Sequence, residues 1–264
     1  RASLLAWLLF AKERRVLRAK GDRLHRVRHV AETLALSEPP SPELWLRPEH
    51  EMAALEHLPN GVPVLALGPT ANWGGKQWPI ERFAALARRL TASDGPLPNA
   101  RVAVFGAANE RSAAQPLLDD LPSEQVIDLI GRIELPVVLA CLRRCDLFVG
   151  NDSGLMHMAA AAPIPTLGLF GPSREELYSP WGEMAAAVRT DRSFDDIRND
   201  PAYDYRKQDS WMITLPVEKA EAAARDLLTR VGRATGRRIL SSQYWGPSIM
   251  KRANWPTVWK PLVS

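Results

Sequence analysis

Between residues 62 and 171, short apolar runs alternate with stretches of helical periodicity, and this alternation constrains the fold more than any other feature of the chain. Short runs that are apolar at nearly every position are typical of parallel strands covered by helices on both faces. Five such strands joined by four helical connections predict an α/β domain with a Rossmann-like parallel sheet. The runs are VPVLALG (62–68), RVAVFG (101–106), QVIDLIG (125–131), DLFVG (146–150) and PTLGLFG (165–171).

The connections between these runs carry helical patterns. In the first of them, Phe83, Leu86 and Leu90 recur at helical spacing behind Pro79, a residue that suits a first helical turn. Ligands of open parallel sheets bind outside the carboxyl ends of the strands, so we expect functional residues in the loops that follow the strands. The predicted helices are 79–90, 109–121, 135–145 and 153–162.

The flanks of the alternating region differ from it. Residues 1–36 have a helical pattern without a preceding strand, and the Pro-rich stretch 37–50 is typical of a linker. A further strand is expected at 185–190 and a helix at 217–231. We therefore predict three regions: residues 1–60, helical with a linker; residues 61–231, the Rossmann-like domain; and residues 232–264, a basic tail that contains Trp245, Trp255 and Trp259.

Both ends of the chain are basic. Residues 1–30 carry nine Lys or Arg against two acids, and residues 230–264 carry seven against none, so each end has a net charge of +7 around a middle of −10. Such ends suit an anionic membrane surface, and no nucleic-acid partner is expected. Ordinary solvated helix surface is the alternative, and the tail tryptophans could instead pack against another domain.

Composition excludes several classes of protein. The longest apolar run, residues 2–11, is about half the length that a membrane span needs, and the basic stretch after it does not fit a signal peptide. We therefore expect a cytoplasmic protein. Cys141 and Cys145 can form neither a disulfide framework nor a complete zinc site, and we expect both to be packed thiols.

The strongest local motif is NDSGLMHMAAA, residues 151–161, which follows a strand and begins a helix. We expect Asn151 or Asp152 to cap the helix and the amides of Ser153, Gly154 and Leu155 to remain free in its first turn. Free amides and the positive end of a helix dipole bind anions. His157 lies one turn beyond Ser153 on the same face, where it could donate to a phosphate. The alternative is a capped core helix with a satisfied histidine.

A second loop, GPTANWGGKQWP (68–79), lies at the same predicted edge of the sheet. It offers the Thr70 hydroxyl, two glycines and the Lys76 ammonium, although its spacing is not that of a Walker motif. A solvated surface loop is the alternative. Two anion-binding loops at one edge indicate a diphosphate ligand, and Glu110 in a third loop could accept hydrogen bonds from ribose hydroxyls.

The motifs in these loops, together with VAVFGAANE and LIGRIELPVVLACLRRCDLFVG, resemble the carboxyl-terminal, nucleotide-sugar-binding domain of glycosyltransferase family nine, the lipopolysaccharide heptosyltransferases. The resemblance is strong over residues 60–190 and weak over 1–60. It implies half of a GT-B fold, and an inverting, metal-independent transfer of heptose from ADP-heptose to the lipopolysaccharide core. The implied donor-binding residues are Thr70, Lys76, Glu110, Asp152, Ser153, Gly154 and His157, with the 129–131 turn lining the nucleoside pocket.

Members of that family begin with an acceptor-binding domain that supplies an aspartate as general base. The first 60 residues of this chain contain no unit of strand, Gly-rich loop and helix, so we expect them to be a remnant of such a domain. No residue of this chain can be assigned as the catalytic base. The expected acceptor is a lipid-linked saccharide, and the enzyme would bind it as a peripheral protein at the inner membrane.

Two other functions remain open on the sequence. The chain could be a noncatalytic module that binds a nucleotide or nucleotide-sugar. A nicotinamide dehydrogenase is disfavoured because no G-x-G-x-x-G follows the first strand. No cofactor is expected, and no paired-carboxylate motif suited to magnesium or manganese is present, so the leaving diphosphate would be stabilised by Lys76 and helix amides.

Overall fold

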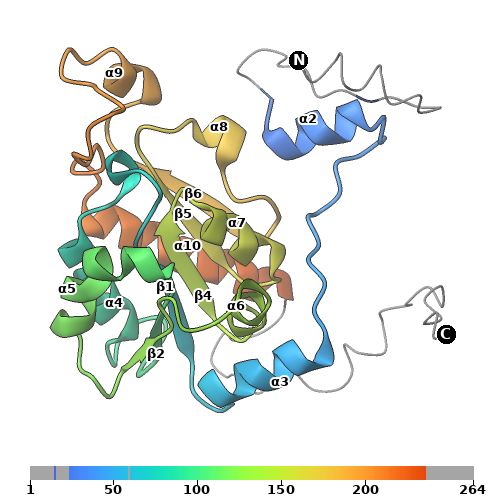
Figure 1. Cartoon of the computed structure of the whole chain (residues 1–264), viewed down its shortest axis with the longest axis vertical. Coiled ribbons are helices and arrows are strands. Elements are labelled where there is room, and N and C mark those ends of the chain that lie inside the picture. Colours follow the sequence, from blue (N-terminus) through green and yellow to red (C-terminus); the bar gives the residue numbers. More distant parts are fainter. Residues whose placement is uncertain (1–14, 16–23, 59, 236–264) are drawn as a thin grey trace.

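The computed structural model describes residues 15, 24–58 and 60–235, and a six-stranded parallel sheet forms its centre (Figure 1). The strand order is β3-β2-β1-β4-β5-β6. All five predicted strands are present, and the strand expected at 185–190 completes the sheet as β6, so the predicted α/β, Rossmann-like fold is confirmed. The strands are β1 (Val64–Gly68), β2 (Arg101–Val104), β3 (Val126–Asp128), β4 (Leu147–Asn151), β5 (Thr166–Phe170) and β6 (Ala185–Arg189).

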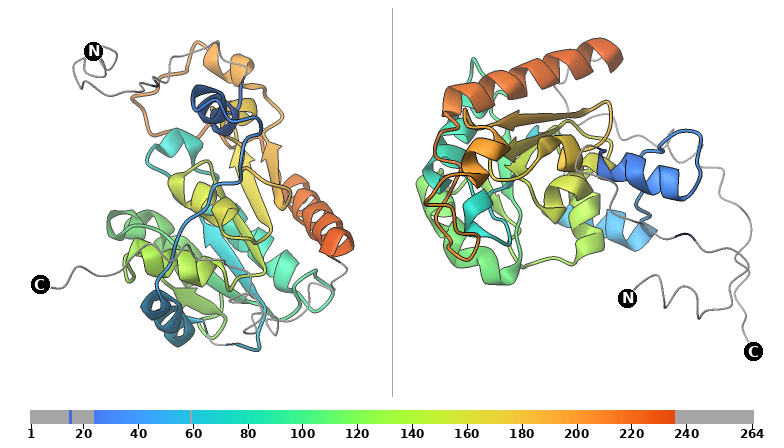
Figure 2. Two further views of the ribbon diagram at one scale, coloured as in Figure 1. Left: turned by 90° about the vertical axis from the view of Figure 1, so that its right-hand side faces the viewer. Right: turned by 90° about the horizontal axis from the view of Figure 1, so that it is seen from above.

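Helices cover both faces of the sheet (Figure 2). One face packs against α4, α5 and α10, and the other against α3, α6 and α7. Successive strand residues alternate between the two cores: Leu65 and Leu67 face the first, and Val64 and Ala66 face the second. The helices nearest the sheet are α3 (Pro48–His57), α4 (Ile80–Thr91), α5 (Arg111–Asp120), α6 (Leu135–Leu142), α7 (Gly154–Ala161) and α10 (Val217–Thr235).

The segment before β1 is partly integrated into this domain. The predicted linker, 37–50, overlaps the start of α3, whose Ala54 is buried in the same core as α6. Farther upstream, α2 (Arg26–Thr33) lies beside α8 (Glu175–Tyr178), where the Arg26 guanidinium donates to the Tyr178 hydroxyl at 3.0 Å (Figure 1). The helical pattern of residues 1–36 is therefore confirmed at α2; residues 1–14 and 16–23 lie outside the described chain.

Three short elements appear where no helix was expected. They are η1 (Gly74–Lys76), α8 (Glu175–Tyr178) and α9 (Phe194–Arg198), whereas η2 (Ala108–Glu110) overlaps the start of the predicted helix 109–121. Within the described part of the chain, no helix is long and apolar enough to span a bilayer. The tail tryptophans Trp245, Trp255 and Trp259 lie outside the described residues.

The two cysteines are packed thiols, as expected from the sequence. Both are buried in the core, Cys141 within α6 and Cys145 just after it, and the Cys145 thiol donates to the Cys141 carbonyl at 3.3 Å. Burial raises the pKa of the Cys141 thiol to about 12 and that of Cys145 well above its ordinary value. Both thiols therefore stay protonated at neutral pH.

Candidate functional site

The candidate site lies between β1 and β4, where the order in which successive strands join the parallel sheet reverses. These strands are neighbours, and Gly68 at the end of β1 pairs with Gly150 of β4. Their following loops therefore start side by side, which is the usual position of a ligand in such sheets. The tertiary structure thus brings together the two loops that the sequence singled out, 68–79 and 151–157.

Asn151 joins these two loops. Its side chain is fully buried; its amide group donates to the Pro69 carbonyl at 2.7 Å, and its oxygen accepts from the Trp78 amide at 3.0 Å. The expectation that Asn151 or Asp152 caps α7 is wrong. β4 continues through Asn151 and the helix starts at Gly154, so the capping position falls on Ser153, whose hydroxyl accepts from the Met156 amide at 3.5 Å.

Replacing Asn151 with alanine should therefore destabilise the protein by about 2 to 3 kcal/mol, because it leaves a buried donor and a buried acceptor unpaired. Urea unfolding of both proteins measures this difference. As a control, alanine at the exposed Asn109 should change the unfolding free energy by less than about 0.5 kcal/mol. A loss below about 1 kcal/mol at Asn151 would contradict its role as the bridge.

Lys76 and Asp152 form an ion pair across the gap between the loops. The ammonium lies 2.6 Å from the Asp152 carboxylate, and the side chains are 27% and 7% exposed. The sequence placed both residues at one edge of the sheet but did not predict that they pair. The pair holds the partly exposed Lys76 side chain next to the start of α7. It also neutralises the Asp152 carboxylate, which would otherwise repel an anion there.

The first turn of α7 presents backbone amides to open space. Among the residues that the structure describes, none accepts a hydrogen bond from the amides of Gly154 or Leu155. Gly154 is exposed, and a Cβ built on it meets no atom within 4 Å. The backbone of Gly154 does not need glycine for its conformation, so the missing side chain leaves room in front of the amides. This geometry suits close approach of an anion.

His157 lies on the same helix face as Ser153, one turn further along. Although the residue remains exposed to solvent, the surrounding protein atoms desolvate the imidazole and thereby lower its pKa below the ordinary 6.5. The Asp152 carboxylate opposes this effect, whereas His25 and Lys76 add to it. The imidazole is therefore neutral at pH 7, and one ring nitrogen can donate a hydrogen bond.

A second group of predicted residues gathers around Gly106, at the end of β2. A Cβ built on Gly106 would lie 3.4 Å from the Thr70 hydroxyl, 3.4 Å from the Glu110 carboxylate and 3.5 Å from the Ile130 side chain. Thr70, Glu110 and the predicted 129–131 turn therefore come together from the loops after β1, β2 and β3. Glu110 also accepts from the Ala107 amide at 2.7 Å, which stabilises the start of η2.

The 129–131 turn depends on Gly131. Gly131 has a φ of +65°, and its amide donates to the Gly106 carbonyl at 2.9 Å. A Cβ at this position would lie 2.5 Å from the Ala108 Cα, so only glycine fits.

The sequence missed the segment that covers the Gly-Gly-Lys loop. Residues 203–215 cross the carboxyl edge of the sheet from α9 and contact η1: the Gly74 amide donates to the Gln208 side chain at 2.7 Å, and the Trp211 amide donates to the Gly75 carbonyl at 3.0 Å. These contacts join residues 134 and 136 positions apart. Residues 191–210 are polar and rich in turn-forming residues, and such a composition does not indicate which loop they contact.

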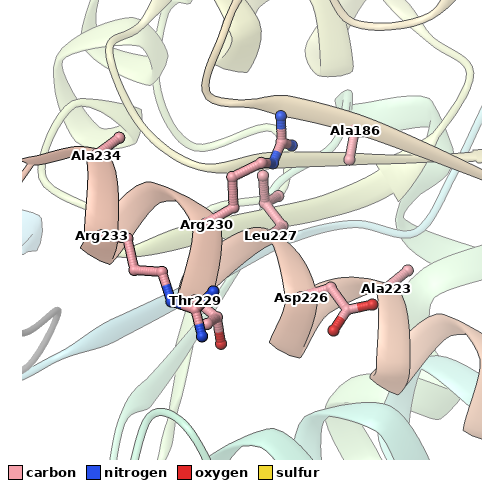
Figure 3. Close-up of a pocket in the computed structure, with 8 residues that line it drawn as sticks. All are labelled: Ala186, Ala223, Asp226, Leu227, Thr229, Arg230, Arg233 and Ala234. Carbon is pink, nitrogen blue, oxygen red and sulfur yellow. The ribbon is translucent and has the colours of Figure 1, made fainter.

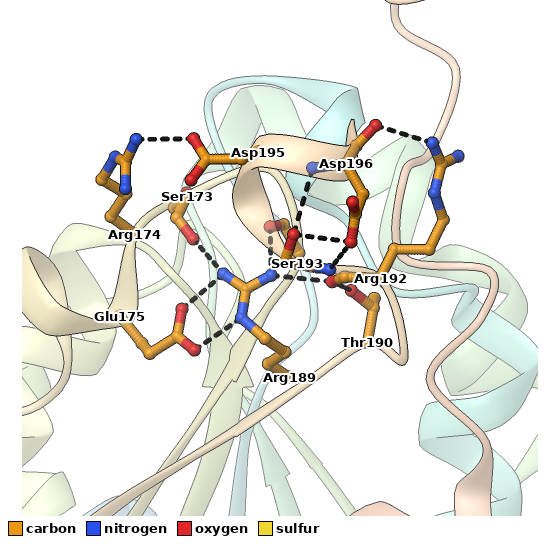
Figure 4. Close-up of polar contacts among 10 residues, drawn as sticks. Ser173, Arg174, Glu175, Arg189, Thr190, Arg192, Ser193, Asp195 and Asp196 are labelled. Carbon is orange, nitrogen blue, oxygen red and sulfur yellow. Dashed lines mark hydrogen bonds and ion pairs between the residues drawn. The ribbon is translucent and has the colours of Figure 1, made fainter. Parts of the chain in front are cut away.

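The loops after β5 and β6 are fastened by Arg189 (Figure 4). Its guanidinium pairs with Glu175 and donates to the carbonyls of Gly171, Ser173 and Arg192. Because every donor direction is used within the protein, this cluster is a structural anchor for the segment that leads to residues 203–215.

A hollow of about 810 Å³ lies away from this site. It runs along α10 beside β6 and is lined by Ala186 and by α10 residues such as Asp226, Arg230 and Arg233 (Figure 3). Arg230 donates to the carbonyls of Glu183 and Ala185 along the edge strand. None of the predicted donor-binding residues lines this hollow, so it is not part of the candidate site.

Comparisons with known proteins agree on one family. The model of glycosyltransferase family 9 (heptosyltransferase) matches residues 6–200. The chain is 31% identical to lipopolysaccharide heptosyltransferase 2 of Salmonella typhimurium over 186 residues, which are 66% of this chain and 51% of that protein. It is 30% identical to the Escherichia coli K12 protein of the same name, over 62% of this chain and 48% of that protein. The chain thus spans about half the length of the curated relatives it matches.

Solved structures share the fold. The structure of E. coli ADP-heptose lps heptosyltransferase II matches with a TM-score of 0.64 and 23% identity, covering 82% of this chain and 65% of that one. A glycosyl transferase family 9 structure from Veillonella parvula DSM 2008 matches with a TM-score of 0.68 and 22% identity, covering 80% and 62%. At these identities the likeness establishes the architecture, and the roles of individual residues rest on the geometry above.

Proposed function

The chain belongs to glycosyltransferase family 9, the heptosyltransferase family, and we propose that it forms the donor-binding part of an enzyme that transfers heptose from ADP-heptose to a lipopolysaccharide core acceptor. The observation that carries this proposal is the Lys76–Asp152 pair beside the unpaired amides of α7, at the β1–β4 edge of the sheet. A solved relative is described as bound to ADP, which fits a site for a nucleoside diphosphate.

The proposed diphosphate would meet hydrogen-bond donors on two sides. We assign the Lys76 ammonium and the Thr70 hydroxyl to one side, and the amides at residues 153–155 with the His157 imidazole to the other. As the bond from the sugar C1 to the diphosphate breaks, negative charge develops on the departing oxygen, and preorganised donors stabilise that charge. Since these donors belong to the protein, we propose that transfer needs no metal ion; chelators should leave the rate unchanged.

The remaining residues divide between nucleoside and sugar. Glu110 and the 129–131 turn lie around Gly106, beside Thr70, and we assign Glu110 to the ribose hydroxyls. Asp152 uses one carboxylate oxygen for Lys76. Its second oxygen has no partner among the described residues and can accept a hydrogen bond from a sugar hydroxyl.

Transfer with inversion requires an acceptor hydroxyl to attack C1 opposite the diphosphate and a base to take its proton. We propose that acceptor and base are held by protein outside this domain, in line with relatives about twice as long. The lipid-linked acceptor would place the enzyme at the cytoplasmic face of the inner membrane, with the basic ends of the chain facing anionic lipid.

Calorimetric titration with ADP-, UDP- and GDP-sugars tests the proposal. We expect measurable binding of ADP-heptose and ADP, and at least tenfold weaker binding of the UDP and GDP compounds. Preference for another base would overturn the proposed donor. Binding without transfer to a lipopolysaccharide core acceptor, even in a longer natural chain, would instead favour the noncatalytic binding module.

Binding of ADP should depend on His157 protonation. A bound phosphate favours the charged imidazole and raises its pKa from below 6.5, so the complex takes up a proton and affinity rises as the pH falls from about 7.5 toward the pKa of the free protein. ADP itself titrates in this range, so the test compares the pH profile of the wild type with that of His157→Asn. Identical profiles would remove His157 from the phosphate site.

A further inference from the structure

We propose that the segment 208–211 positions Lys76, and that Gln208 is a positioning residue for donor binding; this inference rests on the proposed function. The segment bonds to the loop on both sides of the lysine. Gln208 accepts from the Gly74 amide at 2.7 Å, the Trp211 amide donates to Gly75 at 3.0 Å, and the Ser210 hydroxyl donates to the Gln77 carbonyl at 2.6 Å.

The two glycines of the loop are buried and leave no space for larger residues. A Cβ on Gly74 would lie 2.2 Å from the Gln208 carbonyl oxygen, so this glycine is required by close packing of the loop under Gln208. A Cβ on Gly75 would lie 2.4 Å from the Trp73 ring, so this glycine is required by packing within the loop itself. Both positions differ from the open space in front of Gly154.

The segment itself is fixed at both ends. Upstream, the Tyr203 ring lies 5.5 Å from Trp211 and 6.1 Å from Trp73, and the Arg192 guanidinium stacks over Trp211. Downstream, the Leu215 carbonyl accepts from the buried Trp78 indole at 2.9 Å and from Arg82. Rigid attachment on both sides lets the segment set the position of η1.

Fixing the backbone at residue 76 matters because a lysine side chain has four rotatable methylenes and reaches its partners only from a suitable Cα. Asp152 holds the ammonium from the other side at 2.6 Å. If the hydrogen bonds that hold the Gly74 and Gly75 backbone were lost, the Lys76 ammonium would spend less time near the first turn of α7. Binding sites lose affinity with shifts of about 1 Å in such supporting groups.

A double-mutant cycle on the full chain tests this inference, with ADP as the calorimetric ligand. Gln208→Met keeps the length of the side chain but removes the acceptor for the Gly74 amide. We expect it to weaken ADP binding about three- to tenfold in the wild type, the effect of one lost hydrogen bond, and less than about twofold in a Lys76→Ala background. Thermal unfolding should show every variant folded at the titration temperature.

Two further variants complete the experiment. Gln208→Glu retains an acceptor oxygen and should bind ADP more tightly than Gln208→Met, whereas Tyr205→Ala, a change at an exposed neighbour, should bind like the wild type. Equal losses from Gln208→Met in both backgrounds, or no loss in either, would overturn the positioning role alone. Normal ADP binding by Lys76→Ala would overturn the phosphate assignment of the proposed function, and the positioning role with it.

Discussion

Replacing Gly154 with valine should abolish ADP binding while the protein stays folded. A Cβ at this position meets no protein atom, so the valine side chain would occupy the space in front of the α7 amides where the phosphate must approach. The helix itself should not suffer, because valine has a higher helix propensity than glycine by a few tenths of a kcal/mol. Calorimetry with ADP and thermal unfolding together measure both effects.

Gly154→Ala provides a graded control. Its single methyl should weaken binding less than valine does, and its unfolding temperature should equal or exceed that of the wild type. If the valine variant binds ADP as the wild type does, the anion site at residues 151–157 is wrong. If the valine variant unfolds instead, Gly154 has a structural role, and the open space in front of it does not reflect a phosphate site.

The second large effect is expected at Lys76. Lys76→Ala should weaken ADP binding by about 1.5 to 3 kcal/mol, or about 10- to 150-fold, because a hydrogen bond to a charged group is lost. The loss should lie at the upper end of this range, since Asp152 is only 7% exposed and would remain next to the diphosphate without its partner. Calorimetric titration with ADP measures it.

Asp152→Asn separates these two contributions. Adding it to Lys76→Ala removes the unpaired carboxylate and should recover part of the lost ADP affinity. Alanine at Lys219, an exposed lysine that pairs with Asp191 on the surface, should leave the affinity unchanged and shows that loss of a positive charge alone is insufficient. Unchanged affinity in Lys76→Ala would exclude this lysine from the donor site.

Local sequence patterns were enough to predict the strands, because burial on both faces of a parallel sheet imposes an apolar run of limited length on each of them. They were also enough to indicate the loop at residues 151–157, since a short polar sequence between a strand and a helix has few structural solutions. The error at Asn151 and Asp152 is instructive. One extra residue in β4 moves the cap to Ser153 and turns the two preceding side chains toward the loop at 68–79.

The sequence by itself therefore determined the α/β class, the loops that carry the candidate site and the residue types that we propose bind a phosphate, because these follow from periodicity and neighbours along the chain. Only the tertiary structure decided which groups meet. The Lys76–Asp152 pair, the Asn151 bridge and the Gln208–Gly74 hydrogen bond join residues 76, 73 and 134 positions apart. Such pairings arise from β4 lying beside β1 and from the path of residues 190–216, and no local pattern encodes either one.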